Sequence, residues 1–164
     1  MIALSEDEVR SLAEAGAAAP SGGNMQAWLL RAAPSRGTMD LYLDPERSES
    51  FIDVDRMGSL LGLGSFTENV ALAAAGRGID LRTEILGLSS LDAPVVRMTS
   101  RARGVSVEPS ALRDAIFERA TNRQTGEGTT IEDEVVRELG AAARDVVAGF
   151  DVSLVSGGDK EPLA

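Results

Sequence analysis

The residues best suited to chemistry are gathered in one short segment near the N-terminus. Residues 19–28 read Ala-Pro-Ser-Gly-Gly-Asn-Met-Gln-Ala-Trp and contain the single tryptophan of the chain. The two glycines leave backbone N–H groups open to a ligand, because no Cβ blocks its approach. The side-chain amides of Asn24 and Gln26 both donate and accept, which suits a flat heteroaromatic ring with carbonyl and imide edges. The alternative interpretation is an ordinary helix stop and turn.

A second candidate segment, residues 119–123, reads Arg-Ala-Thr-Asn-Arg. Two arginines that flank a hydroxyl and an amide can hold a phosphate through charge-assisted hydrogen bonds. The segment comes at the expected end of a helix, so the alternative is a solvated helix terminus, where cations are favourable. Only 16 residues of the chain are Lys or Arg, which makes this pair of arginines notable.

A third candidate is the polar pair Glu68 and Asn69, which lies within the most apolar stretch of the chain. A buried polar pair needs partners. A ligand, a subunit contact or a satisfied packing position would each supply them. The acidic residues between 44 and 55 lack the alternating oxygen spacing of a calcium loop, and no metal site is predicted.

Composition excludes several classes of function. The formal net charge of −10 argues against nucleic acid as a partner, because phosphate binding needs clustered Lys and Arg. The chain has neither Cys nor His, which excludes thiol nucleophiles, iron–sulfur clusters, His-dependent triads and the usual zinc sites. Apolar runs stay shorter than the ~18–20 residues of a membrane span, and no signal-peptide pattern is present. We therefore expect a cytoplasmic protein without membrane contacts.

The hydrophobic pattern predicts the elements that position these candidates. Ser5, with Glu8 three residues later, is typical of a helix N-cap, and this helix is expected to end near Ala18, before Pro20. The pattern then predicts, in chain order, a hairpin of a buried strand at 28–32 and a strand at 39–43, a polar loop at 44–55, a largely buried helix at about 65–75, strands at 79–85 and 95–99, helices that start at Pro109 and near Thr130, and a strand at 150–154.

This order of elements predicts an α+β fold with a largely antiparallel sheet flanked by helices. The length of 164 residues is expected to form a single domain, which is enough chain for a sizeable core. The apolar helix over 60–75 needs more cover than a short chain readily gives. We therefore expect a homodimer.

Three segments together resemble the nitroreductase-like flavoprotein family. Residues 19–28 resemble the family signature A-P-S-x-x-N-x-Q-P-W, and residues 119–123 resemble its phosphate motif R-x-[ST]-x-[RK]. Residues 64–79 are similar to its central-helix pattern G-x-x-x-x-N-x-x-L-A-A-x-x-x-G. No single pattern is specific, but the three together span most of the chain.

The resemblance implies an α+β flavoprotein, usually an intertwined homodimer, that binds FMN and passes hydride from NAD(P)H to nitro compounds, quinones or similar small acceptors. It assigns no catalytic side chain, because the flavin carries the redox chemistry and the protein positions it. Carried over to this sequence, it implies that the ring and ribityl chain are held by Ser21, Gly22, Asn24 and Gln26, and the phosphate by Arg119, Thr121 and Arg123.

The sequence departs from the usual family pattern in two ways. The phosphate motif normally precedes the A-P-S segment, whereas here it follows, and Ala27 stands where the family has proline. The reversed order resembles a divergent branch, which includes nitroreductase-like domains attached to a ThiF/MoeB-like adenylating domain. Chains of that branch continue beyond the position of residue 164, so this sequence is expected to correspond to their N-terminal portion.

Two other functions stay open at this point. One is a non-catalytic relative that stores flavin or serves as a dimerisation module. The other is an acidic α+β interaction domain without a cofactor, which would bind no flavin at all.

Overall fold

The computed structural model describes residues 1–51, 53–106, 110–123 and 131–146. The chain separates into two compact units, residues 1–121 and residues 122–164. The first unit holds the sheet and the first four helices, whereas the described helix of the second unit is α5 (Asp133–Val146). The single domain expected over 1–164 stays a prediction.

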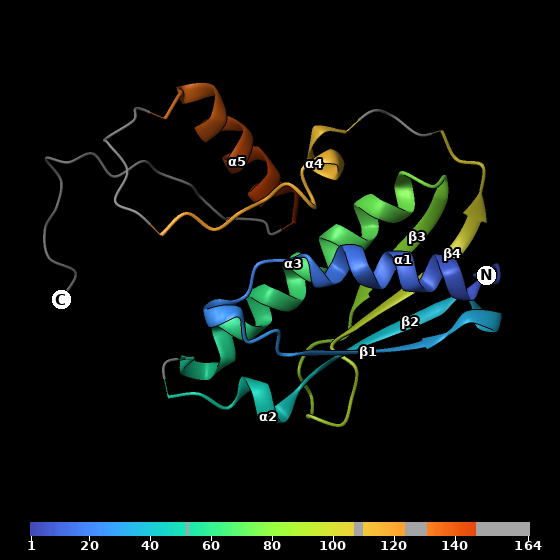
Figure 1. The fold of residues 1–164 in the computed structure, drawn as a ribbon, viewed down its shortest axis with the longest axis horizontal. Helices are drawn as coiled ribbons and strands as arrows, with labels where there is room; N and C mark the ends of the chain where they lie inside the picture. Colours follow the sequence, from blue (N-terminus) through green and yellow to red (C-terminus); the bar gives the residue numbers. More distant parts are fainter. Residues whose placement is uncertain (52, 107–109, 124–130, 147–164) are drawn as a thin grey trace, which may run out of the picture. The chain divides into compact units, whose positions relative to one another are not determined.

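An antiparallel sheet of four strands forms the base of the first unit (Figure 1). Its strand order is β1-β2-β4-β3, and every neighbouring pair runs antiparallel. The strands are β1 (Trp28–Ala33), β2 (Thr38–Leu43), β3 (Ile79–Ile85) and β4 (Val96–Arg103). This arrangement of helices and antiparallel strands confirms the α+β prediction, including the hairpin of the first two strands.

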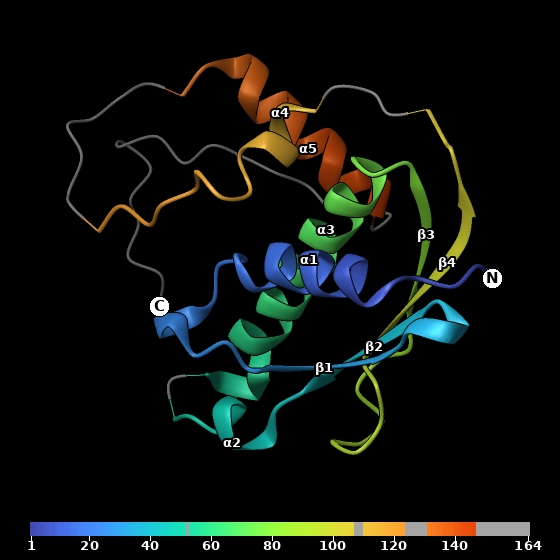
Figure 2. The same ribbon diagram turned by 45° about the vertical axis from the view of Figure 1, so that its right-hand side comes forward.

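Two helices, α1 (Glu6–Ala17) and α3 (Met57–Ala75), lie on the same face of this sheet, as Figures 1 and 2 both show. The strand β2 alternates between buried and half-buried side chains, so that Met39, Leu41 and Leu43 point into the core. Phe66 and Val70 of α3 are buried in the same core. On the outer row of the sheet, Arg97 of β4 makes two hydrogen bonds to Asp40, at 2.7 and 2.8 Å.

The N-terminus of α1 has the predicted capping box. The Ser5 hydroxyl accepts from the Glu8 N–H at 3.1 Å, and the Glu8 carboxylate accepts from the Ser5 N–H at 2.7 Å. Arg103, at the end of β4, donates to the Glu8 carboxylate and to the Ala3 carbonyl. The hydrogen bond from Arg103, helped by the Ser5 N–H, lowers the Glu8 pKa to about 2. The start of α1 is therefore tied to the end of β4.

The central helix α3 begins at Met57, about eight residues before the predicted start near residue 65. The Asp53 carboxylate accepts from the N–H groups of Gly58 (2.7 Å) and Ser59 (3.1 Å) and from the Ser59 hydroxyl (2.5 Å). These bonds satisfy N–H groups that a helix start leaves open, and the Ser59 hydroxyl lowers the Asp53 pKa most. Helix propensity did not predict this start, because glycine is a poor helix former and several glycines lie in the first turns of α3.

Several other predicted boundaries are wrong. The predicted polar loop at 44–55 contains two short helical turns, α2 (Pro45–Ser48) and η3 (Val54–Arg56). The strand β1 is a half-exposed edge strand rather than a buried one, with Leu29 exposed to 44%. The predicted starts at Pro109 and Thr130 and the strand at 150–154 lie outside the described residues. Of the described helices, none has the length and apolar character needed to cross a bilayer.

Candidate functional site

The segment 19–28 forms a tight, strained loop between α1 and β1. Its centre is a single helical turn, η1 (Gly22–Asn24), and the Ser21 hydroxyl accepts from the Gln26 N–H at 3.1 Å. Gly23, Asn24 and Gln26 all have positive φ, at 58°, 58° and 50°. Positive φ is uncommon for Asn and costly for Gln, and such strain gathers at binding sites. The predicted loop is therefore present, with backbone strain that the sequence pattern did not reveal.

The end of α1 lies directly before this loop, and its carbonyl groups have unusual partners. A helix end leaves carbonyls open, and N–H groups of the following residues commonly bind them. Here the residue two positions after the cap is Pro20, which has no N–H. The Asn69 amide of α3 donates to the Ala15 carbonyl at 3.0 Å, and the Arg119 guanidinium donates to the Ala18 carbonyl at 3.2 Å.

These two contacts join the three segments that the sequence singled out. Asn69 belongs to the segment 64–79 and Arg119 belongs to the segment 119–123. They bind carbonyls that lie four residues and one residue, respectively, before the segment 19–28. The sequence separations are 54 residues for the Asn69 bond and 101 residues for the Arg119 bond. The fold therefore brings all three segments to one place, the C-terminal end of α1.

The Arg119 guanidinium also donates to the Thr121 hydroxyl at 3.2 Å, so both of its terminal nitrogens have partners. The sequence predicts Arg119 at the end of a helix that starts at Pro109. The helix observed there ends at Asp114, five residues earlier, and the Arg119 N–H closes a further turn by donating to the Ala115 carbonyl at 3.0 Å. The helix α4 (Ala111–Asp114) is a single turn capped by Ser110 and is followed by a turn, with Ile116 buried and Leu112 exposed. Arg123 belongs to the second unit of the chain, and its exposed side chain is assigned from the motif.

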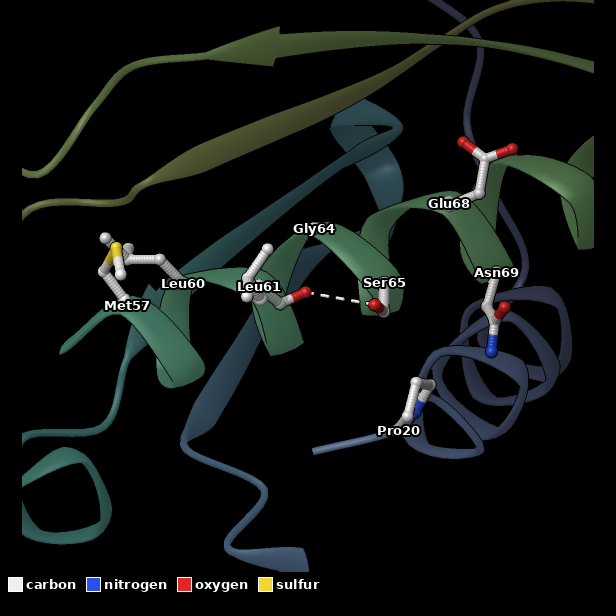
Figure 3. A pocket seen from close by; sticks show the side chains of 8 residues that line it. All are labelled: Pro20, Met57, Leu60, Leu61, Gly64, Ser65, Glu68 and Asn69. Atoms are coloured by element: carbon white, nitrogen blue, oxygen red, sulfur yellow. Dashed lines mark hydrogen bonds between the residues drawn. The ribbon is translucent and has the colours of Figure 1, made fainter. Parts of the chain in front are cut away.

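A hollow of about 760 Å³ lies along the exposed side of α3 (Figure 3). Its lining residues are Pro20, Met57, Leu60, Leu61, Gly64, Ser65, Glu68 and Asn69. One end is apolar, and Ser65 donates to the Leu61 carbonyl at 3.0 Å within its wall. Figure 3 shows the Asn69 amide pointing toward α1 and Pro20, with the Glu68 carboxylate pointing away from them.

A second hollow of about 300 Å³ adjoins the first, because Glu68 and Asn69 line both. Arg119 lines this second hollow together with apolar side chains of the segment 112–116. The two hollows thus form one continuous surface from the loop after α1 to Arg119. Glu68 is exposed here, so the expected burial of the pair Glu68 and Asn69 is wrong for the glutamate. For Asn69 the packing alternative holds, since the amide binds Ala15.

The predicted loop residues contribute less to the hollow than expected. Pro20 lines it, and a Cβ built on Gly62 of α3 would lie 3.7 Å from the Ser21 Cβ, which places Ser21 beside α3. Gly22, Asn24 and Gln26 are not among its lining residues. Sequence reasoning missed the apolar wall at Met57, Leu60 and Leu61. The helix is apolar on nearly every side, so periodicity gave no sign of which side is exposed.

This surface can bind a flat molecule with apolar faces and polar edges. The apolar wall suits the faces, the Asn69 amide suits a carbonyl or imide edge, and the Arg119 guanidinium suits an anionic tail. Among the described residues, no group of three or more acidic side chains is arranged to hold a metal ion. The arrangement is one for binding and positioning.

Comparison with known proteins gives one relative in sequence. No family model matches the chain. The sequence is 31% identical, over 115 residues, to the uncharacterized protein MT1398 of Mycobacterium tuberculosis (strain CDC 1551 / Oshkosh). The match covers 70% of this chain and 16% of that protein, so the chain spans a small part of its relative.

Two solved structures are similar in the arrangement of their elements. NfrA1 of B. megaterium aligns with 93% of this chain and 81% of its own, at 14% identity and a TM-score of 0.49. A protein of Desulfovibrio desulfuricans, assigned as a nitroreductase and crystallised with FMN, aligns with 73% of this chain and 88% of its own, at 20% identity and a TM-score of 0.47.

Proposed function

We propose that this chain binds FMN and belongs to a flavin-dependent oxidoreductase, which passes hydride from NAD(P)H to a small acceptor such as a nitro compound or a quinone. One observation carries the proposal. Asn69 and Arg119, from two of the three family-like segments, donate to carbonyls at the end of α1, directly before the third segment. Three family-like segments that lie far apart in the sequence thus meet beside one hollow.

The residues present fit the shape and chemistry of a flavin. A hollow of about 760 Å³ lies within the range of ~300–1,000 Å³ that is typical of small-molecule sites. Its apolar wall suits the ring faces. The loop that follows Pro20 would supply the amides of Asn24 and Gln26 for the polar edges, as the family motif implies. FMN, when bound, supplies the hydride chemistry, which suits a chain without His or Cys.

The proposed roles of the chain are binding and orientation. Ser21, Gly22, Asn24 and Gln26 would hold the ring and ribityl chain, while the segment 119–123 would hold the phosphate. Within that segment, Thr121 and Arg123 offer a hydroxyl and a guanidinium, and the role of Arg123 is taken from its motif. No side chain is proposed to carry a proton or electrons.

The test starts with the purified chain, incubated with FMN and freed of unbound ligand by gel filtration. A flavin absorption band that stays with the protein is the expected result, and a colourless protein would contradict FMN binding by this chain. Addition of NADH or NADPH without oxygen should then bleach the band, and a small quinone should restore it. A band that neither nucleotide bleaches would instead indicate a flavin-storage or dimerisation module.

The cofactor-free alternative gives a different pattern. An acidic interaction domain would bind neither FMN nor riboflavin, and replacement of Arg119 or Arg123 would leave flavin retention at the background level. Parallel incubation of an unrelated acidic protein of similar size sets that background.

A further inference from the structure

We propose that Arg119 and Asn69 are positioning residues, which hold the C-terminal end of α1 and thereby fix the conformation of the loop 19–26. The proposal gives Arg119 a role that differs from a phosphate ligand. The predicted loss of flavin affinity on replacing Arg119 rests on the function proposed above. The predicted loosening of the loop 19–26 does not.

The first argument is that α1 completes its own C-terminal end only in part, through the Ala18 N–H, which binds the Glu14 and Ala15 carbonyls, and the Ala19 N–H, which binds the Gly16 carbonyl at 2.9 Å. The helix has three acidic residues in its first turn and no basic residue in its last turn. Its cap residue Ala18 has right-handed helical angles (φ −73°, ψ −3°), and the chain takes positive φ only from Gly23 onward, so the left-handed ending that glycine favours is absent. Pro20 then removes the N–H that would fold back onto the helix. The Ala15 and Ala18 carbonyls therefore need donors from outside the helix to complete their hydrogen bonding.

The second argument is that the two donors come from separate elements. The Ala15 carbonyl accepts from the Ala18 N–H at 3.2 Å and from the Asn69 amide at 3.0 Å. The Ala18 carbonyl accepts from Arg119 at 3.2 Å, and the positive charge of Arg119 lies where a helix dipole favours a cation. The two contacts fix the last turn of α1 against α3 and against the segment after α4.

The third argument is that the strained loop begins immediately after this fixed point. Asn24 and Gln26 hold positive φ, and such conformations persist only when the surroundings impose them. The described contacts within the loop are short-range, from Asn24 N–H to the Ser21 carbonyl (3.0 Å), from Met25 N–H to the Gly22 carbonyl (3.0 Å) and from Gln26 N–H to the Ser21 hydroxyl (3.1 Å). From outside the loop, the Arg47 guanidinium donates to the Gln26 carbonyl at 3.5 Å near the β1 end, and the contacts of Asn69 and Arg119 anchor the α1 end.

The fourth argument concerns the guanidinium of Arg119 itself. One terminal nitrogen binds the Ala18 carbonyl, and the other binds the Thr121 hydroxyl at 3.2 Å. A lysine keeps the charge but lacks the planar fork that reaches two acceptors. A charge-conserving replacement therefore separates a positioning role from simple attraction of a phosphate.

Hydrogen–deuterium exchange of the whole chain, without flavin, tests the effect on the loop. We expect exchange in the peptide 18–26 to rise about tenfold in Arg119→Ala, in Arg119→Lys and in Asn69→Leu, because each loses an anchoring hydrogen bond. Exchange in β3 should stay unchanged, which shows that the fold is intact. Arg101→Ala, a replacement of an exposed arginine on β4, is the matched control and should leave both regions unchanged. Unchanged exchange of the loop in Arg119→Ala and Asn69→Leu would overturn the proposal.

Flavin binding provides the second readout. Arg119→Ala and Arg119→Lys should weaken FMN and riboflavin by the same factor, because both ligands meet the same displaced loop. Near-normal FMN binding by Arg119→Lys, with riboflavin unaffected by Arg119→Ala, would make Arg119 a phosphate ligand and overturn its positioning role. If the unaltered chain binds no flavin, the proposed function fails, while the exchange measurement still decides whether the two residues position the loop.

Discussion

At the scale of single residues, the decisive contacts join side chains to backbone carbonyls. The sequence could nominate Arg119 and Asn69 as candidates, because an Arg-x-Thr-x-Arg segment and an asparagine in an apolar helix are both unusual. It could not predict their partners, since every residue carries the same carbonyl and only the fold decides which ones meet a donor. The sequence did indicate that the end of α1 lacks one donor, because Pro20, two positions after the cap residue Ala18, has no N–H.

Arg123 gives the first prediction. Arg123→Ala should weaken FMN by about 10- to 100-fold while riboflavin changes little, because a hydrogen bond to a charged group contributes about 1.5–3 kcal/mol and riboflavin has no phosphate. Equilibrium dialysis of both ligands measures the ratio. Arg137→Ala, an exposed arginine of α5, is the control. Equal weakening of both ligands would contradict the assignment of Arg123 to the phosphate.

At the scale of elements, the hairpin, the strand β3 and the capped start of α1 were predictable, because each carries its signal within a few residues. The start of α3 was not, because Asp53 binds N–H groups five and six residues later and three glycines weaken the helical pattern. The packing of α1 on α3 was also unpredictable. It depends on Gly16, where a built Cβ would lie 2.5 Å from the Phe66 ring.

Replacing two glycines of these helices by alanine should change the free energy of unfolding in opposite directions. Gly16→Ala should lower the free energy of unfolding by about 1–3 kcal/mol, because the new methyl group meets the buried ring of Phe66. Gly64→Ala should raise it by about 0.5–1 kcal/mol, because alanine favours the helix and its Cβ meets open space. Urea denaturation followed by circular dichroism measures both. A stabilising Gly16→Ala would contradict the close packing of α1 on α3.

The tie between α1 and β4 predicts a dependence of stability on pH. The Glu8 pKa is lowered from 4.5 to about 2 in the folded chain, chiefly by Arg103. A depressed pKa contributes stability that is fully present above pH 4.5 and is lost as the pH falls toward 2. The urea midpoint of the unaltered chain should therefore fall more steeply between pH 5 and pH 2 than that of Glu8→Gln. Parallel curves for the two proteins would show that the pair contributes nothing.

At the scale of the whole molecule, a row of apolar side chains along α3 is left uncovered by the other elements of the first unit. Met57 is 65% exposed and Leu61 is 73% exposed, although the helix is apolar on nearly every side. The apolar stretch over 60–75 predicted that this helix needs cover. Which side of α3 lacks cover was not predictable, because an evenly apolar helix gives no periodic signal.

The exposed row predicts a homodimer, as the family resemblance also implies. Light scattering of the flavin-free chain after gel filtration should give twice the mass of one chain. Leu61→Glu should shift this mass toward the monomer, because a charge would enter an apolar interface. Leu61 also lines the hollow, so mass and not flavin binding is the readout. Phe51→Glu replaces a side chain that is 97% exposed outside this row and should leave the dimer intact. A monomeric unaltered chain at all concentrations would contradict this expectation.

The most direct measurement of the central claim is a titration of the chain with FMN, followed by the emission of Trp28. This residue is the single tryptophan, and it lies two residues after the strained Gln26 and against Phe66 of α3, with ring centroids 5.4 Å apart. If the three segments form a flavin site at the end of α1, FMN must quench Trp28 in a saturable way, at one FMN per chain. Free tryptophan at equal absorbance corrects for light absorbed by FMN. Emission that follows the free-tryptophan control throughout would contradict a flavin site at this place.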